Sequence, residues 1–490
     1  MEQTNLKQLS LEESAYKNRY LILGILLFGL FMGVLDSTMI SIGLPTITRH
    51  YNVDLTLSQW AITGYLVSMT GLFIFFGKLS ERTGKVKMFL AGWLIFGVSS
   101  LACGLAPGMN ELIIFRIAQG VGSSMVSCVS AAMIYLVFPR EEQGKALGLL
   151  GVVFGGAALV GPGLGGVIVD HLGWEYMFFV NVPLCAVLLV LAFKYLKIPE
   201  STTRHLEMDW IGAATLFVSV ASLMLLCTEV AKDMKLTNIM AVYAIAFVLS
   251  SVAFLYRERR CARPLLELSI FSNLKFTLPI VCSMLLYVGI SVATTLAPFF
   301  FQGAMGYTAS DVGFISMVVP LFMMFTVPVA GAMYDKRHFR FQAAAGAIIY
   351  AIGMLVVGLG VLAIDFWVII LGFAIRGVGV GVFSSPNSIE VMSEVSKDKL
   401  ALASSVQSTA NYMSMMVGVA IATIFVTVSL NQNGYYGLIY LAGSSLLSSS
   451  IGSIMIVSAA LCVLAAMVSA LRNSGQVSRA PVKDDQAGAV

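Results

Sequence analysis

Apolar runs of about 20 residues recur along nearly the whole chain, and each matches the hydrocarbon thickness of a lipid bilayer. Of the 490 residues, 58% are hydrophobic and only 11% are charged, whereas soluble domains have about 25% charged residues. No soluble core can bury so much apolar surface, so we predict an all-α polytopic membrane protein. Breaks at charges, prolines and glycine clusters place fourteen transmembrane helices at 20–46, 58–79, 88–106, 111–138, 145–169, 174–197, 209–230, 237–256, 275–302, 311–334, 341–363, 366–392, 401–429 and 448–471.

Basic residues distinguish the two sides of the predicted membrane. Of the 30 Lys and Arg residues, 25 fall in tails and loops on the side of the N-terminus, three fall in loops on the other side, and two lie inside spans. Cytoplasmic loops carry an excess of Lys and Arg. The bias therefore predicts a multi-pass protein of the cell membrane with both termini cytoplasmic. It also supports fourteen helices, because a miscount would reverse the bias downstream of the error.

Two sequence patterns occur twice. GKLSERTGKVK at 77–87 is echoed by GAMYDKR at 331–337, and RIAQGVG at 116–122 is echoed by RGVGVG at 376–381, with offsets of 254 and 260 residues. Tandem halves around a midplane site are typical of transporters, and chance similarity between glycine-rich helices is the alternative. We therefore expect six-helix bundles at 20–200 and 270–472, two inserted helices at 205–260, and tails at 1–19 and 473–490.

Five motifs follow one another in the first half of the chain. They are LDSTMISIGLP at 35–45, GKLSERTGKVK at 77–87, RIAQGVG at 116–122, GLLGVVFGGAALVGPGLGG at 148–166 and GWEYMFFVNVP at 173–183. In this order they resemble the motifs of the major facilitator superfamily, specifically its fourteen-helix drug:proton antiporter family. The resemblance covers about residues 20–472 and implies the major-facilitator fold.

Asp36 lies near the middle of the first predicted span. A carboxylate there costs about 2.5–3.5 kcal/mol on insertion scales, so we expect it to face a cavity or a partner and to carry a proton. A structural carboxylate capped by Ser37, Thr38 or Ser41 is the alternative. Arg116, about one turn into the fourth span, is the obvious counter-charge, unless its side chain extends to the headgroups instead.

The resemblance adds roles for residues near this pair. In the resembled family the helix-4 arginine is linked to proton coupling, which carries over to Arg116 with Gln119 and Gly120 beside it. Thr38, Gln119 and Arg376 are candidates for lining a substrate cavity. Arg376 occupies the corresponding place in the second half, where structural anchoring is the alternative.

Two motifs are candidates for the moving parts. The resemblance implies a gating latch in the loop after the second helix, whereas a basic loop that only sets topology is the alternative. Glycines of the fifth span allow close helix approach and its proline bends the helix; the resemblance links this motif to antiport, and a passive packing seam is the alternative. The latch residues are Gly77, Glu81, Arg82, Gly84 and Lys85, and the antiporter-motif residues are Gly148, Gly161, Pro162, Gly165 and Gly166.

Together, the motifs and the Asp36–Arg116 pair predict a proton-coupled secondary transporter that exports lipophilic small molecules, cationic ones included, by alternating access. A lipid or metabolite carrier on the same scaffold is the alternative. The sequence contains no GxxxxGK[ST], HExxH or GxSxG motif, so it predicts neither a nucleotide-driven pump nor an enzyme. The expected partners are the substrate, protons and the bilayer, without cofactor, metal or nucleic acid. The sequence leaves open whether a periplasmic adaptor is needed.

Overall fold

The computed structural model describes residues 16–198, 208–232, 237–261, 264–337, 339, 341–395 and 400–471. Within these residues the chain forms helices and no strands, and fourteen of the helices are long and apolar enough to span a membrane. The all-α fold and the number of spans are therefore confirmed. Of the predicted tails, residues 1–15 and 473–490 lie outside the described residues.

The first eight spans follow one another from α2 to α11. They are α2 (Arg19–Tyr51), α3 (Leu55–Ser58) with α4 (Trp60–Thr83), α5 (Lys85–Gly104), α6 (Met109–Val137), α7 (Arg140–His171), α8 (Tyr176–Phe179) with α9 (Asn181–Tyr195), α10 (Trp210–Lys232) and α11 (Asn238–Arg260).

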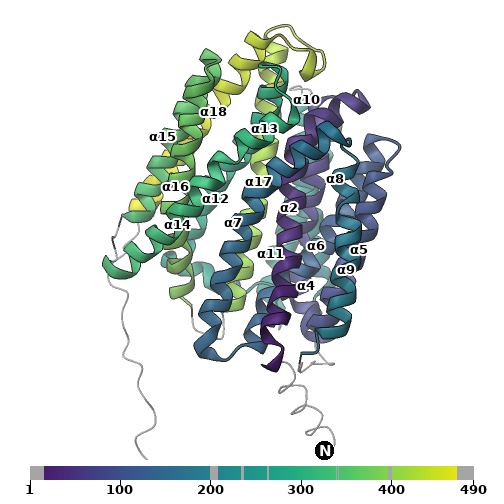
Figure 1. Ribbon diagram of the computed structural model, residues 1–490, viewed down its shortest axis with the longest axis vertical. Helices are drawn as coiled ribbons and strands as arrows, with labels where there is room; N and C mark the ends of the chain where they lie inside the picture. The colour runs from purple at the N-terminus through teal and green to yellow at the C-terminus, as the bar shows by residue number, and fades with distance from the viewer. Residues whose placement is uncertain are drawn as a thin grey trace, which may run out of the picture.

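The last six spans follow the short 3₁₀ helix η1 (Leu268–Ser272). They are α12 (Leu274–Gly303), α13 (Ala309–Ser316) with α14 (Val318–Arg337), α15 (Gln342–Ala363), α16 (Phe366–Ser393), α17 (Leu400–Gln432) and, after η3 (Ile439–Leu441), α18 (Ser444–Ala470). In Figure 1 α14, α15, α16 and α18 lie at the left, α5, α6, α8 and α9 lie at the right, and α7 and α17 lie between them. We call the side on which α2 begins, at the bottom of Figure 1, the N-terminal side, and the other the far side.

The segment from Gly77 to Lys87 is helical rather than a loop, which corrects the predicted end of the second helix. α4 continues to Thr83, α5 begins at Lys85, and only Gly84 breaks the helix, with φ of 100°. Glycine adopts this conformation without the steric cost that a Cβ would add. The prediction ended the helix where the apolar run stops, but charged residues can continue a helix beyond the hydrocarbon.

Glycines bring α6 into close contact with two neighbouring helices. A Cβ at Gly120 would lie 2.5 Å from the Tyr65 carbonyl oxygen of α4, and a Cβ at Gly122 would lie 2.6 Å from the Gly92 carbonyl oxygen of α5. Both distances are too short for any side chain, so these backbones can approach only because the residues are glycine.

The repeated glycine motif performs the same task in α16. A Cβ at Gly377 would lie 2.4 Å from the Val319 carbonyl oxygen of α14, and a Cβ at Gly379 would lie 2.4 Å from the Tyr350 backbone nitrogen of α15. α16 therefore packs against α14 and α15 as α6 packs against α4 and α5. This parallel supports the proposed division into two related six-helix bundles.

The inserted helix α10 packs against both halves of the chain. It runs along α4, where a Cβ at Gly71 would lie 2.8 Å from the ring of Phe217, and it also packs against α17. α11 packs against α10, and only 11% of its most apolar window is buried. The inserted pair therefore covers one seam between the halves and presents α11 to the lipid.

The two ends of α7 differ in how tightly they are packed. On the far side, a Cβ at Gly166 would lie 2.3 Å from the Ala309 carbonyl oxygen of α13, and Gly161 and Pro162 are buried. Toward the N-terminal side, a Cβ at Gly148 or Gly156 would meet no atom within 4 Å. The halves are therefore in contact at the far side, while α7 is loosely packed toward the N-terminal side.

Candidate functional site

A buried ion pair lies within the first half. Asp36 of α2 and Arg116 of α6 are 3% and 1% exposed, and Arg116 Nη1 lies 2.7 Å from Asp36 Oδ2. The structure therefore brings together the two charged residues that the sequence singled out, and Arg116 does not extend to the headgroups. Attraction between ions removed from water is strong, but each ion also needs hydrogen bonds to offset its lost hydration.

Uncharged polar residues complete the coordination of the carboxylate. Gln119 Nε2 donates to Asp36 Oδ1 at 3.0 Å, and Asn181 Nδ2 of α9 donates to the same oxygen at 2.8 Å. Gln119 also donates to Ser100 Oγ of α5 at 2.7 Å. All groups that contact Asp36 are donors, so the arrangement fits an ionised carboxylate, which only accepts hydrogen bonds.

Arg116 has further partners around its guanidinium. Its Nε donates to the Ala61 carbonyl oxygen of α4 at 2.9 Å, and Nη1 donates to Gln119 Oε1 at 2.5 Å. The Arg116 Cζ lies 4.7 Å from the centre of the Tyr65 ring, which adds a cation–π contact. The network therefore joins α2, α4, α5, α6 and α9, so a change at Asp36 is felt by five helices.

The hydroxyl groups next to Asp36 in α2 bond to their own helix. Ser37 Oγ donates to the Val34 carbonyl oxygen, and Thr38 Oγ1 donates to those of Val34 and Leu35. Ser41 Oγ donates to the Ser37 carbonyl oxygen. The alternative in which these hydroxyls cap the Asp36 carboxylate is therefore wrong. In this conformation Thr38 packs against Gly161 and Gln119 belongs to the ion-pair network.

Arg376 lies at the corresponding place in the second half, but its surroundings differ. It is 2% exposed, and its Nε and Nη2 donate to the Tyr350 hydroxyl at 3.3 and 3.1 Å. Its Cζ lies 5.4 Å from the centre of the Phe373 ring. Among the described residues it forms no ion pair. Only the first half therefore combines the arginine with a carboxylate that can bind a proton.

The antiporter motif of α7 contacts α2 on one face and α13 on the other. A Cβ at Gly165 would lie 2.9 Å from Met39 Cα of α2, whereas the Pro162 carbonyl oxygen approaches Gly313 of α13. One turn beyond, Asp170 accepts hydrogen bonds from the backbone N–H groups of Ala309 and Ser310 at 3.2 and 2.6 Å. α7 therefore links the helix that carries Asp36 to the other half of the molecule.

The predicted latch residues lie on the N-terminal side, at the C-terminal end of α4 and the first residue of α5. Glu81 and Arg82 are exposed, and a Cβ at Gly77 would meet nothing within 4 Å. Lys78 of the same segment donates to the Pro264 carbonyl oxygen in the connection after α11. In this conformation the segment is therefore tied to the inserted helices.

A second polar cluster, at the N-terminal side, holds the inserted pair together. Asp209 precedes α10 and accepts hydrogen bonds from the Gly212 N–H at 2.9 Å and from Arg257 Nε of α11 at 3.2 Å. Burial opposes ionisation of Asp209, but the Gly212 and Arg257 hydrogen bonds outweigh it and hold the pKa below its usual range. Asp209 therefore caps the first turn of α10.

Sequence reasoning did not assign roles to Asn181 and Ser100. Asn181 lies in the quoted motif GWEYMFFVNVP, at the first residue of α9, so its position in that motif was an available signal. Ser100 has no comparable signal, because serine is frequent in packed membrane helices.

A helical membrane protein whose two six-helix groups meet along a seam, with an ion pair buried near mid-membrane, has the construction of a solute transporter. The chain belongs to the Major Facilitator Superfamily, whose family model matches residues 26–419. The proteins of this family that it matches are transporters rather than enzymes.

Two curated relatives and one solved structure illustrate the likeness. The chain is 29% identical over 418 residues to "Riboflavin transporter RibZ" of Clostridioides difficile, covering 85% of this chain and 90% of that protein. It is 30% identical over 433 residues to "Multidrug resistance protein 3" of Bacillus subtilis, covering 88% and 82%. The structure matches that of a D-xylose-proton symporter with a TM-score of 0.60 at 18% identity, covering 92% and 95%. At this identity the structural match shows the fold alone.

Proposed function

We propose that this transporter exports lipophilic small molecules in exchange for protons, with Asp36 as the proton carrier and Arg116 as its counter-charge. The observation that carries the proposal is the buried Asp36, which accepts hydrogen bonds from Arg116, Gln119 and Asn181, in a molecule where α7 meets the second half closely at Gly166 and is loosely packed toward the N-terminal side. An exchanger that has released its proton on one side and awaits substrate from that side has this combination of features.

The proposal places the N-terminal side in the cytoplasm, where the basic residues concentrate. Substrate then enters from the cytoplasm between the loosely packed part of α7 and the second half. Bound substrate opens the α7–α13 seam at Gly166 while the segment Gly77–Lys85 closes the N-terminal side, and the substrate leaves on the far side. Asp36 then takes a proton from the far side, which removes its charge, weakens its hold on Arg116 and loosens the five-helix network. The seam closes again, and Asp36 releases the proton on the N-terminal side.

The substrate class is supported by one relative and opposed by another. The chain is similar to a protein named for multidrug resistance, which favours lipophilic compounds. It is also similar to a protein named as a riboflavin transporter, so a vitamin-like metabolite is the second candidate. Within the described spans Asp36 is the buried acid nearest mid-membrane. A cationic substrate and a proton would therefore compete for this one carboxylate.

Transport in proteoliposomes with an imposed pH gradient tests the proposal. The wild-type protein is expected to move ethidium, a lipophilic cation, against its gradient while protons move the other way, and Asp36→Asn is expected to abolish both fluxes. Asp365→Asn is the matched control, because Asp365 caps α16 and lies outside the α7–α13 seam. Proton-independent riboflavin counterflow that persists in Asp36→Asn would contradict the proposal and favour the metabolite carrier.

A further inference from the structure

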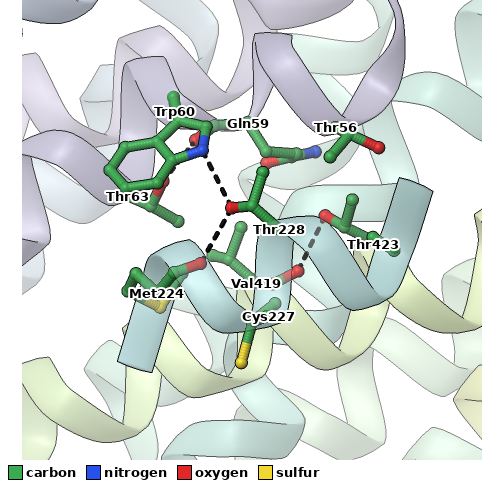
Figure 2. Close-up of a pocket in the computed structure, with 11 residues that line it drawn as sticks. Thr56, Gln59, Trp60, Thr63, Met224, Cys227, Thr228, Val419 and Thr423 are labelled. Atoms are coloured by element: carbon green, nitrogen blue, oxygen red, sulfur yellow. Dashed lines mark hydrogen bonds between the residues drawn. The ribbon is translucent and has the colours of Figure 1, made fainter. Parts of the chain in front are cut away.

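A small pocket lined by both polar and apolar side chains lies on the far side, where three parts of the chain meet (Figure 2). The corner between α3 and α4 supplies Gln59 and Thr63, the inserted helix α10 supplies Thr228, and α17 of the second half supplies Thr423. The pocket therefore spans the seam between the two halves at the point that α10 covers.

The Gln59 amide is buried in this pocket without a hydrogen-bond partner among the described residues. Gln59 is 3% exposed, and neither Oε1 nor Nε2 forms a hydrogen bond with the protein. A buried polar group without a hydrogen-bond partner lowers the stability of the fold. We therefore expect a bound molecule to supply the hydrogen bonds that the Gln59 amide lacks.

The threonine hydroxyls of the pocket have already used their single protons. Thr228 Oγ1 donates to the Met224 carbonyl oxygen at 2.8 Å, and Thr423 Oγ1 donates to that of Val419 at 2.9 Å. Thr63 Oγ1 donates to the Gln59 carbonyl oxygen at 3.1 Å. Each hydroxyl can still accept a bond, and Thr228 already accepts one from Trp60 Nε1 at 3.0 Å. The pocket thus offers several acceptors, together with the unpaired N–H groups of Gln59 Nε2.

We propose that this pocket binds an ordered water molecule, which donates to Gln59 Oε1 and to a threonine hydroxyl across the seam. The free space of about 20 Å³ suits one water, which needs roughly 10–15 Å³ by the same measure, and excludes an organic ligand. No carboxylate lines the pocket, so a cation of this size would lose its hydration without compensation.

The proposed water bridges groups that must separate if the far side opens. Gln59 belongs to the first half and Thr423 to the second. A water-mediated contact satisfies both groups while the seam is closed, and each group can bind solvent once it is open. The inference itself concerns water binding and does not depend on the proposed substrate or on proton coupling.

X-ray hydroxyl-radical footprinting of the full chain in nanodiscs tests the inference, because radicals form from water where it is bound. Met224 lines the pocket and is 3% exposed, whereas Met354 and Met455 are 0% exposed in the apolar core. We expect Met224 to oxidise several-fold faster than Met354 and Met455. The variant Gln59→Leu is expected to lower the Met224 rate several-fold.

The control variant is Gln407→Leu on α17, away from the pocket, which is expected to leave the Met224 rate unchanged. Met354 is an internal check on folding, since its oxidation rate would rise if a variant unfolded.

Thr423→Val keeps the side-chain shape and removes one acceptor, so it is expected to lower the Met224 oxidation rate without raising that of Met354. Equal rates for Met224 and Met354 in the wild-type protein, or a fast Met224 rate that survives Gln59→Leu, would overturn the inference.

Discussion

The Asp36 carboxylate and the Arg116 guanidinium each depend on the other, because both are buried. Removal of one partner from a buried ion pair costs about 3–5 kcal/mol, since the remaining charge is unpaired. We therefore expect Arg116→Gln to lower the free energy of unfolding in detergent by about this amount. The double variant Asp36→Asn with Arg116→Gln is expected to recover a large part of the loss.

Exposed Arg82 supplies the matched control for that experiment. Arg82→Gln removes the same charge at the surface and is expected to change stability by less than about 0.5 kcal/mol. An Arg116→Gln variant as stable as the wild type, or a double variant less stable than both single variants, would show that the pair is not the stabilising unit.

Charge made part of this site predictable from the sequence. Asp36 and Arg116 are rare ionised groups within long apolar runs, so each needed a partner, and the pair was the simplest solution. The hydrogen bonds from Gln119, Asn181 and Ser100 depend on how five helices are rotated and packed. Neutral polar residues carry no comparable cost within a span, so their sequence positions do not say which of them meet.

At the level of elements, the seam between α7 and α13 permits no side chain at Gly166. Gly166→Leu is expected to hold the far side open and to abolish transport while each bundle stays folded. In a background without native cysteines, a cysteine at Thr46 is then expected to react faster with a membrane-impermeant maleimide added from the far side. Thr46 suits this probe because it contacts Gln302 across the seam at 3.5 Å.

The same helix provides the control for the seam experiment. A Cβ at Gly156 would meet no atom within 4 Å, so Gly156→Leu is expected to leave the reactivity at position 46 at the wild-type level. Equal reactivity in the Gly166→Leu and Gly156→Leu variants would show that the close approach of α7 and α13 does not hold the far side closed.

The inserted helix α10 is bonded to the first half more firmly than to the second. Trp60 Nε1 donates to Thr228 Oγ1 of α10, and Lys78 donates to the Pro264 carbonyl oxygen in the connection after α11. At the pocket, α17 faces α10 through Val419, Ala420 and Thr423. We expect α10 to move with the first half. Spin labels at Val218 and Val98 should keep their distance between low and high pH, while labels at Val218 and Val457 should change theirs; the reverse pattern would assign α10 to the second half.

At the level of the whole molecule, fourteen spans were predictable because lipid requires every spanning backbone to form helices about 20 residues long. The packing of α16 against α14 and α15 was only partly predictable from the sequence. The repeat of RIAQGVG as RGVGVG predicted two related halves, but it did not predict which glycine contacts which helix. The position of α10 over the α4–α17 seam was not predictable, because its apolar faces offer no pattern that selects a neighbour.

The central claim is that the protonation state of Asp36 decides which side of the molecule is open. Double electron–electron resonance in nanodiscs tests it with one label pair on each side: Leu105 with Tyr436 on the far side, and Thr83 with Lys336 on the N-terminal side. All four residues are exposed. Ethidium added at high pH is expected to increase the Leu105–Tyr436 distance and to decrease the Thr83–Lys336 distance, and lowering the pH is expected to reverse both changes. The Asp36→Asn protein, which mimics the protonated state, should show the low-pH distances at every pH; distances that follow pH equally in the wild-type and Asp36→Asn proteins would contradict the account.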